Sequence, residues 1–379
     1  MILCNILERN FIFVIFLKNA KLNVIYKNNG KILKNKCKNA EKEGYMNKKL
    51  GNQTYELTNP PHIIASASFV GEKESFGPFG DYLKNYAPDD KMGENTFEKA
   101  ERAFFEKALT LGLKNAKLKR DEVDLLVGGD ILNQIVSINY TARDFAIPLI
   151  GVYSACSTMS ESLAVAAGLM SGGIGKKVVC LTGSHFSAAE RQYRNPLEFG
   201  NQRPTYSQWT ATGAGCSVLS MDGTGPKITR IAFGKVTDFG VVDIANMGAA
   251  MSPAAHQVIK AFLEDTKTTP DDYDLIATGD LGKLGSDILR DLLYKDGIKL
   301  GSNYMDCGHC LFNSEQKTFQ GGSGAGCSAI VLNSYILEKM KAGVFRKVLL
   351  VATGALMSTT LNQQGESIPC IAHVVQIEN

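Results

Sequence analysis

The sequence predicts an α/β fold made of two similar halves, in which mostly parallel sheets are layered with helices between and outside them. Three observations predict this fold. Continuous Val/Leu/Ile runs alternate with helical patterns, which is typical of strands buried on both faces beneath helices. A strand-like run recurs in the second half of the chain, and so does a block made of a turn, a helix and a strand.

The first repeated block is a buried strand that ends in Gly-Asp. Residues 123–130 read Val-Asp-Leu-Leu-Val-Gly-Gly-Asp, and residues 273–280 read Tyr-Asp-Leu-Ile-Ala-Thr-Gly-Asp. Each run follows a helical pattern, which lies over 254–263 in the second half. In the first half, one helix face collects Phe97, Ala100, Phe104, Ala108 and Leu111. Each copy therefore predicts a helix, a loop and a buried strand.

The second repeated block begins at a cysteine. Ala-Cys156-Ser follows a strand over 149–153 and precedes a helix over 159–170 and a strand over 177–182. The matching elements of the second half are Gly-Cys327-Ser, a helix over 329–341 and a strand over 347–352. The order of elements is thus the same in both halves.

This repetition divides the chain into an N-terminal half over 46–223 and a C-terminal half over 224–379. The boundary follows a predicted strand over 214–220 and lies at Thr-Gly-Pro226. Because each half alone is small, we expect both to share one core. The stretch between Gly-Asp and the cysteine is longer in the second half, where it includes the loop 306–310.

Residues 1–45 form an extension that we expect to be disordered, or to precede the natural start at Met46. They hold nine Lys/Arg and three Asp/Glu, which leaves 32 basic against 35 acidic side chains in the rest of the chain. A slightly acidic body argues against nucleic-acid binding. The apolar run Phe11–Leu17 is too short for a transmembrane helix, which needs about 20 residues. An amphipathic membrane anchor is the alternative for this segment.

Seven of the nine cysteines lie in the body, an odd number without the spacing of a disulfide framework, which favours a reducing compartment. The segment Cys307-Gly-His-Cys310 has the CxxC spacing of zinc and redox sites. A zinc site needs a second pair of ligands, and the redox motif needs a thioredoxin-like context. A loop that packs two small thiols is the alternative, and no metal site is predicted.

Cys156 is the sharpest chemical signal, because it lies between a strand and a helix rich in small residues. The free N–H groups and positive dipole end of a helix stabilise a thiolate or a bound anion, and Ser157 and Thr158 can cap the helix or donate hydrogen bonds. The functional interpretation is a nucleophile or an anion seat. The alternative is a small buried cysteine beneath a tight turn.

The duplicated order, with Ala-Cys156-Ser-Thr at the start of the first half's helix, resembles the thiolase and ketoacyl-synthase fold. Several motifs between Gly51 and Ile377 more closely resemble the stage V sporulation protein AD family. They are Gly-Asp-Ile-Leu-Asn-Gln from Gly129, Ala-Cys-Ser-Thr from Ala155, Ala-Glu-Arg-Gln-Tyr-Arg from Ala189, Met-Gly-Ala-Ala-Met-Ser-Pro-Ala-Ala from Met247, Pro-Asp-Asp-Tyr-Asp-Leu from Pro270, Gly-Gly-Ser-Gly from Gly321 and Gly-Glu-Ser-Ile-Pro-Cys-Ile-Ala-His from Gly365.

The resemblance implies a protein that binds dipicolinic acid, alone or with calcium, and helps move it into the developing spore. It would be peripheral on the spore inner membrane and work beside membrane proteins of the SpoVA transport system. No cofactor is implied, and a homodimer is compatible with the fold. The ligand is flat, aromatic and doubly negative, so its site needs donors for two carboxylates and a face for the ring.

Condensing enzymes of this fold also use a His or Asn pair from the second half. Where those enzymes place a His, this chain carries Asp280, which would repel an oxyanion, and Gly322 is the expected counterpart of the Asn. We therefore expect a pocket without catalysis. The alternative is an active acyltransferase that uses Cys156, with His309 in place of the missing histidine.

The expected ligand site has four parts. Cys156, Ser157 and Thr158 form the anion seat at the helix start. His185 follows a strand that opens to the same crevice. Three arginines in a loop that ends at Pro204 can hold carboxylates, although each is equally explained as a solvated charge: Arg191, Arg194 and Arg203. Asp130 and Asp280 end the two repeated strands. They either bind a calcium ion that accompanies the ligand or accept hydrogen bonds from loop amides.

Overall fold

The computed structural model describes residues 12–15, 23–26, 47–193, 200 and 202–379 of the chain, which divides into two compact units, Met1–Asn47 and Lys48–Asn379. In the first unit β1 (Ile12–Ile15) and β2 (Asn23–Tyr26) pair antiparallel. Over these two segments the structure differs from the expected disorder. Both are rich in β-branched and aromatic residues, which favour strands.

The second unit contains the repeated sheet that the sequence predicts. The N-terminal half contributes β5 (His62–Val70), β6 (Leu125–Gly129), β7 (Leu149–Gly151), β8 (Lys177–Ser184) and β10 (Gly213–Ser220), in the spatial order β7-β6-β8-β10-β5. The C-terminal half contributes β11 (Lys227–Phe233), β12 (Leu275–Thr278), β13 (Tyr304–Asp306), β15 (Lys347–Ala355) and β16 (Cys370–Glu378), in the order β13-β12-β15-β16-β11. Numbered within its own half, each sheet has the same strand order, so the predicted duplication is confirmed.

Strand direction also repeats between the halves. Of these ten described strands, four of the five in each half run in the same direction. The exceptions are β10 and β16, which are antiparallel to both of their neighbours. The sheet is therefore mostly parallel, as expected. The two halves meet at β11, which pairs with β5 through Lys227 and His62 and with β4 (Thr54–Glu56) through three residue pairs. The remaining strands are β3 (Lys48–Lys49) and β4 (Thr54–Glu56) beside β11, and β9 (Trp209–Thr210), which pairs with β14 (Gly322–Ser323).

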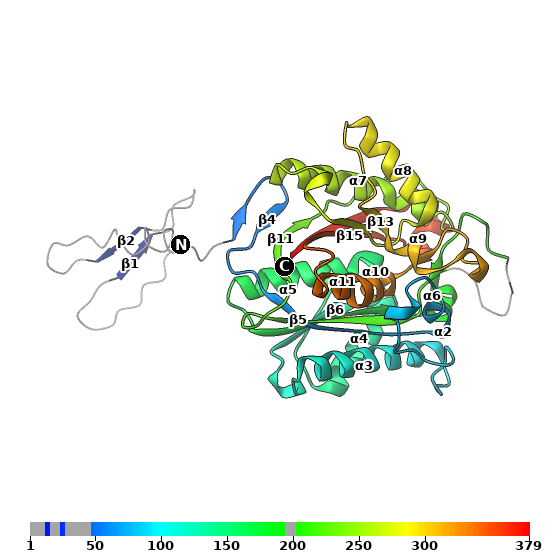
Figure 1. Ribbon diagram of the computed structural model, residues 1–379, viewed down its shortest axis with the longest axis horizontal. Coiled ribbons are helices and arrows are strands. Elements are labelled where there is room, and N and C mark those ends of the chain that lie inside the picture. Colours follow the sequence, from blue (N-terminus) through cyan, green and yellow to red (C-terminus); the bar gives the residue numbers. More distant parts are fainter. Residues whose placement is uncertain (1–11, 16–22, 27–46, 194–199, 201) are drawn as a thin grey trace. The chain divides into compact units, whose positions relative to one another are not determined.

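The helices form three layers around the two halves of the sheet (Figure 1). Between them lie α5 (Thr158–Ser171), α10 (Ala325–Val331), the π-helical turn Leu332–Ile336 and α11 (Leu337–Lys341). One outer layer holds α3 (Phe97–Ala116) and α4 (Val136–Phe145), and the other holds α7 (Met247–Thr266) and α8 (Gly282–Lys295). The shorter helices are α2 (Glu72–Ser75), α6 (Phe186–Tyr193), α9 (Cys307–Leu311) and α12 (Thr359–Gln363), with 3₁₀ turns at Gly80–Tyr82, Arg120–Glu122, Asn133–Ile135, Ala155–Ser157, Pro270–Asp272 and Ser314–Gln316.

Local sequence explains why the principal helices form where they do. Thr96 and Asn246 cap α3 and α7, because their side chains accept hydrogen bonds from the backbone N–H groups of Lys99 and Ala249. The predicted face of α3 packs on the sheet, with Phe104 fully buried. In the middle layer, small buried residues such as Ala164 line α5, and they allow both halves of the sheet to approach it.

Two further features of the fold concern expectations from the sequence. The region expected as a long loop before Pro204 begins as the helix α6, so Arg191 is helical rather than in a loop. Among the described residues, no helix combines the length and the apolar character needed to cross a bilayer.

Candidate functional site

Cys156 lies in the tight turn Ala155–Ser157 between β7 and α5, as the sequence predicts. Ala155 adopts a left-handed backbone with φ of 51°, an uncommon conformation for a residue with a side chain. The hydroxyls of Ser157 and Thr158 are buried and donate to the carbonyls of Ser154 and Ala155 at 2.8 and 2.6 Å. They stabilise the turn and do not line the cavity, so their expected ligand contacts are not supported by this geometry.

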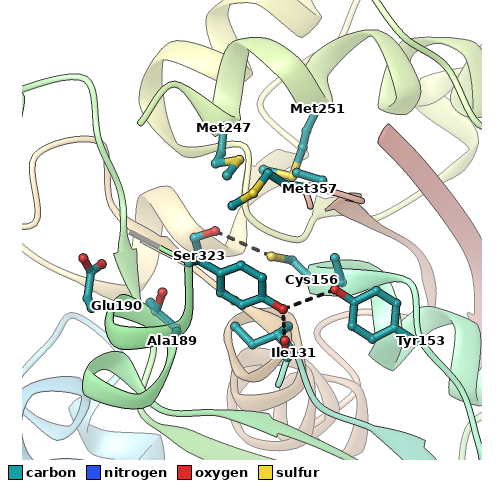
Figure 2. A pocket seen from close by; sticks show the side chains of 14 residues that line it. Ile131, Tyr153, Cys156, Ala189, Glu190, Met247, Met251, Ser323 and Met357 are labelled. Carbon is teal, nitrogen blue, oxygen red and sulfur yellow. Dashed lines mark hydrogen bonds between the residues drawn. The ribbon is translucent and has the colours of Figure 1, made fainter. Parts of the chain in front are cut away.

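Cys156 faces a cavity of about 540 Å³ between the two halves (Figure 2). The walls are mainly apolar and soft, and three methionines approach Cys156 from the C-terminal half. The lining residues are Ile131, Tyr153, Ala155, Cys156, Ala189, Glu190, Tyr193, Thr210, Met247, Met251, Ser323, Gly324, Ala355 and Met357. Among the described residues that line it there is no Lys, Arg or His, and Glu190 is the ionisable side chain on the wall besides the tyrosines and Cys156.

Ser323 and Asp280 lie behind Cys156. The Cys156 Sγ is 3.7 Å from the Ser323 hydroxyl, which donates to Asp280 Oδ2 at 3.1 Å (Figure 2 shows the first contact). Thr353 donates to Asp280 Oδ1 at 2.7 Å. Ser323, rather than the expected Gly322, therefore presents a side chain to the cysteine.

The electrostatics of this group disfavour a thiolate. Burial, the negative charge of Asp280 and a hydrogen bond to it raise the pKa of the Cys156 thiol well above its usual range. Burial raises the pKa of Asp280 to about 7, against the opposing effect of its hydrogen bonds from Thr353 and Cys156. The raised pKa opposes the interpretation of Cys156 as a nucleophile and favours the alternative, a small buried cysteine beneath a tight turn. Asp280 lies beside the cysteine, but its carboxylate oxygens are occupied by internal donors.

Asp130 does not reach the cavity. Its carboxylate accepts hydrogen bonds from the backbone N–H groups of Leu132 and Ile138 at 2.9 and 3.0 Å, so it fixes the start of α4. Burial raises its pKa to about 6. The interpretation in which strand-end aspartates hydrogen-bond to loop amides holds for Asp130. In the described part of the chain, no group of three His, Cys, Asp or Glu residues is arranged to hold a metal ion.

His185 and the arginines also lie away from the lining. The His185 Nε2 is 2.6 Å from the carbonyl of Asp90, and its buried ring lies beside Phe97. Burial lowers the pKa of His185. Arg191 pairs with Glu98. These partners explain why neither residue is available as a carboxylate donor at Cys156.

Arg203 donates to the carbonyls of Gln208 and Lys317 at 3.1 and 2.9 Å and lies 4.8 Å from the Trp209 ring centroid. It braces a loop and does not line the cavity. Arg194 lies outside the described residues. The expected arginine clamp therefore has no member among the described residues that line the Cys156 cavity.

The segment Cys307–Cys310 forms the short helix α9, away from the cavity lining. Asp306 caps this helix by accepting from the backbone N–H of His309 at 2.8 Å. The His309 side chain is exposed and does not line the Cys156 cavity. Cys307 is buried and Cys310 is half-buried, and both are free thiols, as the packed-loop alternative predicts.

Sequence reasoning missed most of the cavity wall. The i, i+4 pair of methionines at the start of α7, Met247 and Met251, was a usable signal, because both lie on one helix face. Met357 and Ser323 carried no comparable pattern, since nothing local shows that their loops return to Cys156.

Comparison with known proteins shows which family the chain belongs to. The stage V sporulation protein AD family matches residues 51–378. A relative of that name from Bacillus subtilis (strain 168) is 42% identical over 328 residues, which cover 86% of this chain and 97% of the relative. The chain belongs to the stage V sporulation protein AD family.

Solved structures show the fold of this stage V sporulation protein AD family member. The chain resembles 3-oxoacyl-[acyl-carrier-protein] synthase III from Aquifex aeolicus VF5 with a TM-score of 0.54 and 14% identity, over 84% of this chain and 100% of that chain. The corresponding synthase III from Pseudomonas aeruginosa PAO1 gives a TM-score of 0.53 and 13% identity, over 84% and 98%. The predicted thiolase-like fold is thus confirmed, and at these identities the likeness concerns the fold alone.

Proposed function

We propose that this chain binds dipicolinic acid non-covalently in the Cys156 cavity and helps its uptake into the developing spore. In this role it is peripheral on the spore inner membrane and works beside membrane proteins of the SpoVA transport system. Membership of the stage V sporulation protein AD family supports a role in spore development. The cavity in front of an unreactive Cys156 supports binding without chemistry.

The observation that carries the non-catalytic part is the contact between Asp280 and Cys156. A condensing enzyme needs a thiolate and a group that stabilises the developing oxyanion. Here an acid occupies the space behind the thiol and raises its pKa. The charge arrangement therefore opposes both requirements.

The walls suit a flat ring but not a bare dianion. Thioether sulfurs make favourable contacts with aromatic rings, and three methionines and two tyrosines line the cavity. A doubly negative ligand placed among apolar groups and Glu190 would lack compensating charge, which is costly. We therefore propose that dipicolinate binds together with calcium, as a complex whose net charge is near zero.

Calorimetric titration with dipicolinate, with and without calcium, tests this function. We expect a heat of binding that is larger or appears at lower concentration when calcium is present. Cys156→Leu should weaken binding by about tenfold or more, because the larger side chain fills the cavity. Cys310→Ser is the matched control, because that thiol lies outside the lining. Absence of any binding heat with the wild-type chain would contradict the proposal.

The rival function is an acyltransferase that uses Cys156. It is favoured by one observation: Cys156 is a half-buried residue that lines a cavity, and the Gly324 backbone N–H donates to its thiol. Mass spectrometry after incubation with an acyl-CoA decides between the two. An acyl adduct on Cys156, absent from Cys156→Ala, would support the enzyme, and we expect none.

A further inference from the structure

A second cavity adjoins the Cys156 cavity. It has a volume of about 980 Å³ and shares three lining residues with the first: Tyr153, Tyr193 and Met357. We call it the outer cavity. Its other described side chains include amides and hydroxyls, namely Asn133, Gln134, Gln192, Thr359 and Thr360, and none of its described lining residues is charged. An apolar cavity at Cys156 therefore lies next to a polar, uncharged one, and the three shared residues stand between them.

The two tyrosines meet at the boundary between the cavities. Their hydroxyl oxygens are 3.3 Å apart, and the Tyr193 hydroxyl donates to the carbonyl of Ile131. Dashed lines in Figure 2 end at the labelled Tyr153 and Ile131. Tyr153 follows β7, whereas Tyr193 ends α6. This hydrogen bond thus links two separate elements where the two cavities share lining residues, and Tyr153 is 42% exposed.

One side of the boundary is held in place by a neighbouring side chain. Gln192 accepts from the backbone N–H of Asn133 at 2.9 Å and donates to the carbonyl of Ile131 at 3.2 Å. The Ile131 carbonyl therefore accepts hydrogen bonds from both Gln192 and Tyr193. These bonds fix the end of α6 to the loop after β6. By contrast, Tyr153 has the Tyr193 hydroxyl as its described side-chain partner and can rotate without breaking this anchor.

We propose that the outer cavity is the route by which ligands reach Cys156, and that the hydroxyl contact between Tyr153 and Tyr193 is a gate that must part for a ring-sized molecule. A single hydrogen bond between partly exposed hydroxyls is weak enough to open thermally. It nevertheless discriminates by size, because a small molecule passes with less rotation of Tyr153 than a ring. The route and the gate do not depend on which ligand the inner cavity holds.

Alkylation of Cys156 in the full chain tests the route. The probes are iodoacetamide, which is small, and N-phenylmaleimide, which carries a ring, and peptide mass spectrometry separates Cys156 from Cys310. Tyr153→Phe keeps the ring and removes the hydroxyl contact. We expect it to raise the N-phenylmaleimide rate by about three- to tenfold and the iodoacetamide rate by less. The ratio of the two rates cancels any change in thiol ionisation.

Thr360→Trp should obstruct the outer cavity and slow both reagents at Cys156. Gln363→Trp, on the same helix α12 but outside the lining, is the matched control and should leave both rates unchanged. Unchanged rates in Thr360→Trp would overturn the route, and equal effects of Tyr153→Phe on both reagents would overturn the gate. Melting temperatures of all variants show whether each has folded. Failure of dipicolinate to protect Cys156 would count against the proposed function and leave the route intact.

Discussion

Cys156 and Asp280 form the residue pair on which the chemistry of the site depends. The sequence places one at a helix start and the other at a strand end, 124 positions apart. In the folded chain the carboxyl accepts from the thiol, so each group changes the ionisation of the other. A position suited to a thiolate by its helix is thereby made unsuitable by a tertiary neighbour.

Asp280→Asn should restore reactivity to Cys156. Removal of the negative charge lowers the pKa of the thiol, and each unit of lowering gives about ten times more thiolate. We expect iodoacetamide to alkylate Cys156 about tenfold faster at pH 8. Asp287→Asn, which alters an exposed carboxylate, is the control and should not change the rate. An unchanged rate in Asp280→Asn would show that burial alone suppresses the thiol.

The same aspartate should make folding stability depend on pH. Its pKa is raised from 3.8 to about 7 in the folded chain, so the folded state holds a proton that the unfolded state releases. This contribution is complete below pH 4 and is lost as the pH rises through 7. Asp280→Asn should flatten the profile of stability between pH 4 and 7 relative to wild type, as measured by urea unfolding. An identical profile in the two proteins would contradict the raised pKa.

At the scale of elements, the close approach of β15 to the Cys156 turn positions the cavity. A Cβ added to Gly354 would lie 2.0 Å from the carbonyl oxygen of Ser154. Because this neighbour is backbone, it cannot turn aside as a side chain would. The turn that carries Cys156 and a strand of the other half are thus packed directly together.

Gly354→Ala should destabilise the chain by about 1–3 kcal/mol, the usual cost of overpacking, and weaken ligand binding because the turn must shift. Thermal unfolding and calorimetry measure the two effects. Gly168→Ala is the matched control: the added Cβ meets Ile231 at 3.7 Å, an ordinary contact, within α5. It should stabilise the helix slightly. Equal stability of the two variants would refute close packing at the turn.

At the scale of the molecule, the body from Lys48 onward is one compact unit, and the family match begins at residue 51. A chain that starts at Met46 should therefore keep the fold. We expect a melting temperature within about 2 °C of the full chain, because the second compact unit and the family match both lie after the removed residues. A cooperative transition lost on truncation would show that residues 1–45 contribute to the core.

A homodimer is a further expectation at this scale. β7 is the last strand of the described sheet on its side, and its edge carries Leu149 and Ile150, which are partly buried. Strand edges of this kind invite pairing with a second chain. Analytical ultracentrifugation should give twice the mass of one chain, and Ile150→Lys should reduce the dimer fraction. A monomer at all concentrations would exclude this interface.

Much of the architecture could be predicted because its signals are local. The repeated Gly-Asp strands, the Cys156 turn and the amphipathic α3 each depend on neighbours within about 20 residues. The candidate site was predicted less well. His185, Arg191 and Arg203 are typical donors for a carboxylate ligand, but Asp90, Glu98 and Gln208 bind them elsewhere. Each of these partners is chosen by the fold and not by the motif that carries the donor.

The sequence alone determined the family, the duplicated order of elements and the place of Cys156, since periodicity and motif order survive without coordinates. Only the tertiary structure decided that Ser323, 167 positions away, faces the thiol, and that methionines from two elements close the cavity. The physical reason is that burial and charge proximity act through space. Whether a cysteine is a nucleophile or an inert wall depends on which side chains desolvate it, and these come from the opposite half.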